Sequence, residues 1–486
     1  MSTAAPDSFD RLQSRLSTLG PRALSDLTEG CIVVLPSLTF PPEELRKISG
    51  IGRYEERLLC MLLLLRAPAL EMVFVSSLRV EPIVIDYYLS FLDDPEGAHS
   101  RLTMVALDDD APRALSEKLL DRTDVLAHLR RLVDGKDAYL LPFNVTAAER
   151  AVATSVGAPL YGPRPGLAYA GSKSGSRHIA MEAGVPVLPG REDLHSMQAV
   201  DDALRALIAE HPDHAAAVVK LNYGFSGQGN AVVELSRWAG SAMATDTTFC
   251  AAEESWASFA TKITQDGGIV EAMVRHPAML SPSVQMRIAT DGSVEIVSTH
   301  DQILGGPDDQ VYLGCRFPAG AAYRTEIQEA GSRIAKVLAT KGVVGSFGVD
   351  FVIVPGPDGP DIYLSEINLR LGGTSHPFYM ARFATGGTYE PRTGELVVDG
   401  APRSYVATDN PKSEAYRRLT PGGLLDELGA RGLAFDPAAK EGVAIHLLGA
   451  MAEYGKLGAT CIAGTPEGAE ALYERLVATL DHLAGP

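Results

Sequence analysis

The chain has 486 residues, with 43 lysines and arginines against 61 aspartates and glutamates, so its formal net charge is −18. A hydrophobic content of 46% is enough for a sizeable core, which excludes a chain that is mainly disordered. An acidic surface repels phosphate backbones, so we expect no nucleic acid partner. The length allows two to four domains at roughly 100–200 residues each.

The cysteines and the N-terminal residues predict a cytoplasmic protein. The five cysteines lie far apart without a CxxC pair, and an odd number cannot all pair within the chain. The opening MSTAAPDSFDRLQSR lacks the apolar stretch of a signal peptide. The longest apolar run, Leu58–Leu65, is shorter than the about 20 residues that a bilayer requires, so we expect a buried helix there and no membrane partner.

The first third of the chain alternates short apolar strands with helical segments. Strands are expected at Cys31–Leu35, Met72–Val75, Arg101–Leu107 and Ala138–Leu141. This alternation predicts a parallel, doubly wound α/β sheet. The triplet Asp108-Asp109-Asp110 at the end of the third strand is either a metal site or a solvated turn, and the turn is favoured.

The pattern changes after the connector Ala158–Pro165, which is rich in proline and glycine. Two strands around a glycine-rich turn, Ala216–Leu221 and Ala231–Leu235, predict a hairpin. Further strands are expected in a largely antiparallel sheet, at Ile269–Val274, Val284–Ala289, Val294–Ser298, Val349–Val354 and Ile362–Ile367. The segment Thr385–Arg403 is predicted to be a loop and a second domain boundary.

The hairpin turn is the first candidate site. In the sequence VKLNYGFSGQGN, Lys220 lies at a strand end and is followed by Gly224, Gly227 and Gly229. Glycines let a backbone approach phosphates closely and present N–H donors, and a lysine adds a point charge. The alternative is an ordinary glycine-rich hairpin with an incidental lysine.

A second lysine lies at the start of a predicted helix. The segment GLAYAGSKS resembles a Walker A motif, but Ser172 separates Gly171 from Lys173, so a P-loop is disfavoured. Lys173 can still contact a phosphate, because a helix N-terminus attracts anions. The alternative is an exposed lysine in the first helical turn.

Acidic and amide side chains on two consecutive strands predict a magnesium site. Asp350 lies on one strand, and Glu366 and Asn368 lie on the next. Residues two apart in a strand face the same side, so Glu366 and Asn368 point together. Three oxygen ligands suit Mg²⁺, with phosphate oxygens completing its octahedron. Arg370 follows near the same face, and the alternative is an exposed sheet edge.

The residues GGTSHP follow at once and predict a turn into a helix capped by Thr374 or Ser375. Such a turn is either an anion pocket or an ordinary capped helix. Two weaker candidates are the pair His211 and His214, in a polar loop where a metal site is disfavoured, and His300, which follows a strand and is a candidate for a cleft wall.

The order of these motifs resembles the ATP-grasp superfamily over about residues 166–385. It comprises Lys173, Lys220 with its glycine loop, Asp350 and the spacing ExNxRxGGT that begins at Glu366. Within that superfamily the chain is most similar to the pheganomycin-type peptide ligases of actinobacteria.

The resemblance implies a multidomain fold of the α/β and α+β classes. A Rossmann-like pre-ATP-grasp domain is expected at residues 1–165, followed by the small ATP-grasp lobe at 166–268 and the large lobe at 269–400. A small C-terminal α/β domain is expected at 401–486. Its segment from about Gly442 to Leu480 is similar to the C-terminal domain of the same group.

The resemblance also implies a reaction with ATP and Mg²⁺ as cofactors. A carboxylate would attack the γ-phosphate to give an acyl phosphate and ADP, and an amine would then displace phosphate. The expected partners are ATP, a small carboxylic acid of the amino acid type, with a guanidino-bearing acid as one option, and the amine of an amino acid or peptide. A homodimer and a role in peptide-antibiotic biosynthesis belong to the same expectation. The alternatives are an acid–thiol ligase, a kinase-like phosphotransferase and a non-catalytic nucleotide-binding protein.

Nucleotide-binding residues follow from the resemblance alone. The two lysines would contact the phosphates, the loop from Tyr223 to Asn230 would close over them, and Val270–Val274 would meet adenine largely through backbone atoms. The implied residues are Lys173, Lys220, Tyr223, Gly224, Ser226, Gly227, Gly229, Glu271, Ala272 and Met273.

By the same resemblance, Asp350, Glu366 and Asn368 would bind Mg²⁺, and Arg370 would stabilise charge on the acyl phosphate. Arg287 either orients the substrate carboxylate or is a surface arginine. Many relatives hold the ribose with a glutamate a few residues past the adenine contact. The corresponding residues 279–283 contain no glutamate, so the ribose contacts stay open.

Overall fold

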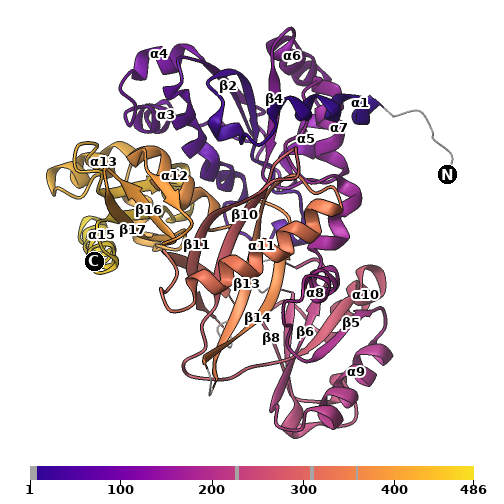
Figure 1. Ribbon diagram of the computed structural model, residues 1–486. Coiled ribbons are helices and arrows are strands. Elements are labelled where there is room, and N and C mark those ends of the chain that lie inside the picture. Colours follow the sequence, from indigo (N-terminus) through magenta and orange to yellow (C-terminus); the bar gives the residue numbers. More distant parts are fainter. Residues whose placement is uncertain (1–7, 225–228, 307–310, 357–358, 486) are drawn as a thin grey trace.

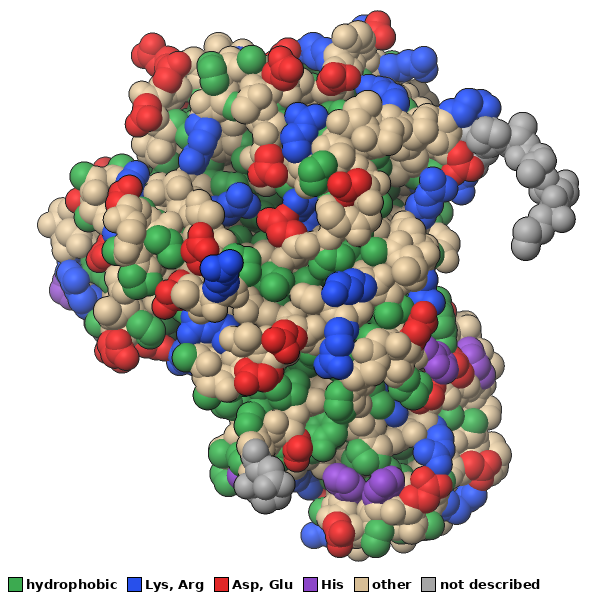
Figure 2. All heavy atoms as spheres, in the orientation of Figure 1, with side chains coloured by type: hydrophobic (Ala, Val, Ile, Leu, Met, Phe, Trp, Pro, Cys, Tyr) green, Lys and Arg blue, Asp and Glu red, His purple; other side chains and the backbone are tan. Residues whose placement is uncertain are grey.

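The computed structural model describes residues 8–224, 229–306, 311–356 and 359–485. Figure 1 shows the N-terminal part at the top, a large curved sheet in the middle, a smaller lobe at the lower right and the C-terminal elements at the left. Acidic and basic side chains are interspersed over the face in Figure 2, so the acidic surplus is spread over that face rather than gathered in one patch.

The N-terminal part contains the predicted parallel sheet. Its strands lie in the order β3-β2-β1-β4 and are all parallel. Their bounds are β1 Glu29–Leu35, β2 Ala69–Ser76, β3 Leu102–Ala106 and β4 Ala138–Pro142. The apolar run Leu58–Leu65 is buried in the 3₁₀-helix η3, Ile51–Arg66. Asp108 has a φ of 53° and pairs with Arg79 in an exposed turn after β3, as the turn interpretation predicted.

Helices pack against both faces of this sheet, and the sheet residues divide between two hydrophobic cores. They are α1 Ser8–Gln13, η1 Ser14–Leu19, η2 Leu24–Asp26, α2 Pro42–Leu45, α3 Pro82–Leu89, α4 Pro95–Ser100, α5 Leu115–Leu120, α6 Thr123–Val133 and α7 Ala147–Val156. The α7 helix begins at a capping box in which Thr146 and Glu149 exchange hydrogen bonds with each other's backbone, and it ends at the left-handed Gly157.

The smaller lobe is a five-stranded antiparallel sheet in the order β5-β9-β6-β7-β8. Its elements are β5 Gly190–Leu194, α9 Met197–Glu210, β6 Ala216–Leu221, β7 Asn230–Glu234, η5 Leu235–Arg237, η6 Ala242–Ala244, β8 Thr247–Phe249, α10 Trp256–Asp266 and β9 Gly268–Ala272. The β6–β7 pairing confirms the predicted hairpin. The expectation that the strand from Ile269 belongs to the later antiparallel sheet is wrong, because β9 pairs with β5 and β6.

The large sheet runs in the order β14-β13-β10-β11-β12-β17-β16-β15, and β19 joins β17 to β18. Its strands are β10 Pro282–Ile288, β11 Val294–Gly305, β12 Val311–Phe317, β13 Gly345–Gly356, β14 Gly359–Asn368, β15 Thr388–Glu390, β16 Glu395–Val398, β17 Ala401–Thr408, β18 Gly442–His446 and β19 Gly458–Ala463. The predicted loop Thr385–Arg403 instead contains β15, β16 and the start of β17. The proposed boundary at residue 401 does not separate two sheets, because β17 pairs with both β12 and β19.

The helices of this second half are η4 Pro165–Gly171, α8 Lys173–Glu182, α11 Arg324–Thr340, α12 Ser375–Thr385, η8 Glu414–Arg418, α13 Pro421–Ala430, α14 Leu448–Tyr454 and α15 Pro466–Ala484. Apolar residues of α8 and α11 pack against β10, β13 and β14 in one core, whereas α12 and α15 join the core that reaches η3. Among the described residues, no helix combines the length and the apolar character that crossing a bilayer requires.

Arg287 on β10 connects the large sheet to the N-terminal part. Its guanidinium pairs with Glu295 on β11, donates to the Tyr161 hydroxyl at 3.2 Å and donates to the Pro21 carbonyl at 2.9 Å. Close by, the Thr290 hydroxyl donates to the Gly20 carbonyl at 2.9 Å. Arg287 is buried, so the structure places it in a contact between domains rather than on the surface.

We expect Arg287→Met to lower the free energy of unfolding by about 2–3 kcal/mol, because it leaves a buried hydroxyl and a carbonyl without their donor. Urea unfolding measures the change. Arg316→Met is the matched control, since Arg316 pairs with Glu470 where both side chains are partly exposed, and such a pair contributes about 0–1 kcal/mol. Equal losses in the two variants would contradict the structural role of Arg287.

Candidate active site

A cavity of about 520 Å³ lies where the two antiparallel sheets and the N-terminal part meet. Most of the residues singled out in the sequence line it. They are Lys173, Lys220, Gly224, Gly229, Glu271, Ala272, Met273, Asp350, Glu366, Asn368 and Arg370. The fold therefore brings segments from three parts of the chain to one space, in which anionic and cationic side chains alternate.

The two lysines reach the cavity because the loop after β6 is tied to the start of α8. The Ser174 N–H donates to the Asn222 side chain at 2.9 Å, and the Lys173 N–H donates to the Asn222 carbonyl at 3.2 Å. Lys220 lies in β6, two residues before Asn222. Both lysines are buried, which removes the alternative of an exposed lysine at residue 173.

Each lysine is paired with a glutamate. The Lys173 ammonium pairs with Glu366 of β14, and the Lys220 ammonium lies 2.5 Å from Glu271 of β9. The second oxygen of Glu271 is 3.4 Å from Arg177. Burial, and then the charge of Lys220, lower the pKa of Lys173 to about 7. An anion entering the cavity would favour the protonated lysine again.

The predicted acid–amide set assembles across the β13–β14 hairpin. Asp350 is the Cα partner of Glu366, and Gly348 is the partner of Asn368. The Asn368 amide nitrogen donates to Asp350 and to Glu366, at 2.9 Å in both cases. Burial raises the pKa of Asp350, because it disfavours the charged carboxylate. These oxygen atoms, gathered on one wall, are the type of ligand that Mg²⁺ prefers.

Arg370 adds a cation beside this set. Its guanidinium donates to the Asn368 amide oxygen at 2.9 Å and to the Leu371 carbonyl at 3.1 Å. Burial lowers its pKa to about 10, so it remains charged at neutral pH. The Ser375 hydroxyl accepts a hydrogen bond from the Gly372 N–H at 2.9 Å, whereas Thr374 makes no side-chain cap to α12.

The end of β9 borders the same cavity through Ala272 and Met273. The N–H of Ala272 donates to the Pro189 carbonyl at 2.7 Å, and the N–H of Met273 donates to the Ala216 carbonyl at 3.0 Å. These two donors are already engaged, so a base bound here would meet carbonyl oxygens and side chains.

Several expected site residues lie elsewhere. Tyr223 is 49% exposed and is not among the described residues that line the cavity. Ser226 and Gly227 lie outside the described residues. Arg287 is held between domains, so a role in orienting a substrate carboxylate is not supported. His300 is buried, and its Nε2 atom lies 2.7 Å from the Tyr405 hydroxyl. It is not among the described residues that line the cavity.

One end of the cavity is lined by residues that no sequence motif predicted. Arg57 stacks over the Tyr54 ring at 4.2 Å and pairs with Asp409, which is 352 residues away in the chain. Lys456 donates to the Tyr54 hydroxyl and lies opposite Lys412 in an isolated β-bridge. All five residues line the cavity. No local spacing could reveal this group, because tertiary contacts alone bring it together.

Comparisons with known proteins identify the family of the chain. The model of the IQCH-like ATP-grasp family matches residues 167–249 and 241–391, and that of the PGM1 C-terminal domain matches residues 423–476. An L-propargylglycine–L-glutamate ligase from Streptantibioticus cattleyicolor is 32% identical over 93% of this chain and 94% of its own length. An IQ motif-containing protein H from Danio rerio is 24% identical over 76% of this chain but only 40% of its own length.

Solved structures share the fold at low sequence identity. A biotin carboxylase from Campylobacter jejuni, in a complex described as beta-gamma-ATP, superposes with a TM-score of 0.56. The match covers 91% of this chain and 90% of the other, at 15% identity.

We expect Asn368→Asp to lower the free energy of unfolding by roughly 1–3 kcal/mol, because it replaces a half-buried donor to two carboxylates with a third carboxylate. Added Mg²⁺ should recover more of the thermal stability of this variant than of the wild-type protein. Melting temperatures with and without Mg²⁺ measure both effects. An equal Mg²⁺ response in the two proteins would contradict the metal assignment.

Proposed function

Because the chain belongs to the ATP-grasp family of carboxylate–amine ligases, we propose that it uses ATP to phosphorylate a carboxylate and couples the acyl phosphate to an amine. One observation carries this proposal. The buried lysines Lys173 and Lys220 line one cavity with Asp350, Glu366 and Asn368.

ATP is the proposed nucleotide, supported by the fold shared with the Campylobacter jejuni complex. Lys173 and Lys220 would hold its phosphates, and the end of β9 would contact the base. Asp350 and Glu366 would hold Mg²⁺ through carboxylate oxygens, and Asn368 would join them by turning its amide oxygen from Arg370 toward the metal. When bound, the metal would neutralise charge on the transferred phosphoryl group.

The proposed chemistry follows from charge. A carboxylate is a weak electrophile until a phosphoryl group turns one of its oxygens into part of a leaving group. Two anions must approach for that transfer, and Lys173, Lys220 and Arg370 would lower their repulsion from fixed positions. The walls of the cavity would also limit hydrolysis of the acyl phosphate by water.

The cationic end of the cavity favours an acidic amino acid as a substrate. Lys412 and Lys456 stand opposite each other, and like charges placed so are destabilising until an anion lies between them. The related ligase carries L-glutamate in its name, which agrees with this charge. A guanidino-bearing acid, expected from the family resemblance, fits this end less well. The peptide-antibiotic context is proposed on that resemblance alone.

A panel of amino acids, offered in pairs with ATP and Mg²⁺, tests the function. We expect ADP and phosphate to form only when both acid and amine are present, with the amide detected by mass spectrometry. AMP and pyrophosphate, or a phosphorylated alcohol, would refute the ligase mechanism. Nucleotide binding without turnover across the panel would favour the non-catalytic alternative.

We expect Glu366→Gln to lower kcat by about 10²–10³-fold. The three proposed Mg²⁺ ligands would lose one of their negative charges and hold the metal and its phosphates less well. Steady-state ADP release measures it. Glu295→Gln is the matched control: Glu295 pairs with Arg287, away from the cavity, and should retain the wild-type rate. Near-normal turnover in Glu366→Gln would remove that residue from the metal site.

The pKa of Lys173 predicts a pH dependence. The free protein loses the Lys173 proton above pH about 7, and bound phosphates favour the charged form, so ATP affinity should fall as pH rises from 7 to 9. Calorimetric titration of the protein with ATP at several pH values measures how the affinity changes with pH. Lys173→Arg keeps its charge throughout and should give a flatter profile. Parallel profiles would show that Lys173 does not contact the phosphates.

A further inference from the structure

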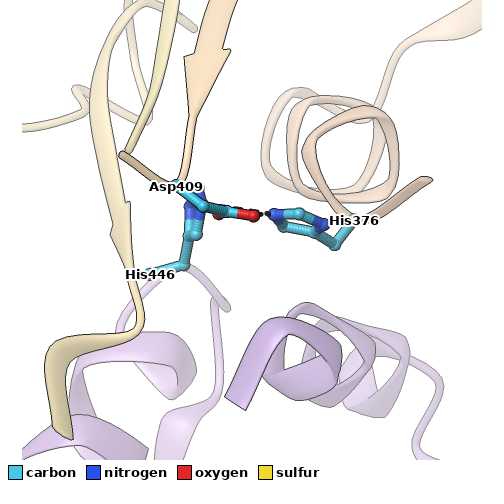
Figure 3. Close-up of side chains that lie close together, drawn as sticks. All are labelled: His376, Asp409 and His446. Carbon is cyan, nitrogen blue, oxygen red and sulfur yellow. Dashed lines mark hydrogen bonds and ion pairs between the residues drawn. The ribbon is translucent and has the colours of Figure 1, made fainter. Parts of the chain in front are cut away.

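Three buried side chains form a compact cluster against the cavity wall. His376 lies at the start of α12, Asp409 follows β17, and His446 ends β18. Figure 3 shows both imidazole rings turned toward the Asp409 carboxylate. The Nε2 atoms lie 3.2 Å (His376) and 2.6 Å (His446) from Asp409 Oδ1, and 3.2 Å from each other. Each residue is less than 5% exposed.

Hydrogen bonds alone account poorly for this geometry. Each Nε2 would have to carry a proton to face the same carboxylate oxygen. Two donors on separate lone pairs of one oxygen would be roughly 4–5 Å apart, whereas the two nitrogen atoms are 3.2 Å apart. The two N–H groups would therefore crowd each other inside a buried site.

A single metal ion fits the same three atoms. A triangle with these sides allows one ion to lie about 2.0–2.1 Å from every corner, which is the usual distance of Zn²⁺ from imidazole nitrogen and carboxylate oxygen. Two imidazoles and one carboxylate also suit a transition metal better than Mg²⁺, which prefers oxygen ligands alone.

Arg57 supports the arrangement from outside the cluster. It pairs with the other carboxylate oxygen of Asp409, Oδ2, which leaves Oδ1 facing the two histidines. Groups of this kind commonly orient a metal ligand. Asp409 and Arg57 both line the large cavity, so the cluster borders the substrate space.

We propose that His376, Asp409 and His446 bind a divalent transition-metal ion, with Zn²⁺ as the ion of choice. The site is separate from the proposed Mg²⁺ set, since it shares no ligand with Asp350, Glu366 or Asn368. It joins α12 to the ends of β17 and β18, so the metal would hold these three segments together. A fourth position is left for water or for an anionic group in the cavity.

Metal analysis of the full chain tests this proposal without any activity measurement. The protein, freed of any histidine tag, is incubated with Zn²⁺ and passed through a desalting column, and its zinc is measured by mass spectrometry. We expect about one zinc per chain in the wild type and less than about a tenth of that in His446→Gln and Asp409→Asn. Glu366→Gln should retain its zinc, which separates this site from the proposed function.

His214→Gln is the control for nonspecific histidine binding. His214 lies in a polar loop, with its ring centroid 6.2 Å from that of His211, and the variant should keep the wild-type zinc content. If the cluster variants do not fold, X-ray absorption of the zinc-loaded wild type should show two imidazoles and carboxylate oxygen at about 2.0–2.1 Å. A wild type that retains no zinc, zinc retained by both folded cluster variants, or a spectrum lacking two imidazoles would overturn the proposal.

Discussion

The site depends on two ion pairs that lie where the small sheet meets the large one. Lys173 with Glu366 and Lys220 with Glu271 each bring a buried lysine against a carboxylate, which is buried in Glu271 and partly exposed in Glu366. Breaking the buried Lys220–Glu271 pair by removing one partner would cost about 3–5 kcal/mol, so this pair helps to hold β6 and β9 in register. The same pairs keep a high density of charge in the cavity, where fixed charges would act on the phosphoryl group of the proposed reaction.

The hairpin of β13 and β14 was predictable because its chemistry is local. Asp350, Glu366 and Asn368 lie on two strands that are consecutive in the chain and paired in the sheet, and a period of two settles which side chains share a face. The parallel N-terminal sheet was predictable for a similar reason, because buried parallel strands appear as short, continuous apolar runs.

Other features could not be read from sequence because distant contacts decide them. The strand β9 has the same apolar character as the strands of the large sheet, and only its pairing with β5 and β6 assigns it to the small lobe. Arg287 lies among apolar residues of β10, and its partners Tyr161 and Pro21 come from another domain. Arg57 and Asp409 meet across 352 residues, so no motif contains both.

The cavity thus has two chemically different ends. One end has the lysines and the acid–amide set, which suit a nucleotide and its metal. The other has Arg57, Lys412 and Lys456 around Tyr54, beside the cluster of His376, Asp409 and His446. Because the N-terminal part and the C-terminal strands both contribute to this second end, substrate choice would depend on how these parts pack.

In the proposed reaction, a carboxylate oxygen of the substrate becomes bonded to the γ-phosphorus. Supplying the acid with ¹⁸O in both carboxylate oxygens, and measuring the phosphate by mass spectrometry, tests this step directly. We expect one ¹⁸O atom in each phosphate released during amide formation, with the other retained in the amide. Phosphate without the label, or the label appearing in AMP, would contradict it.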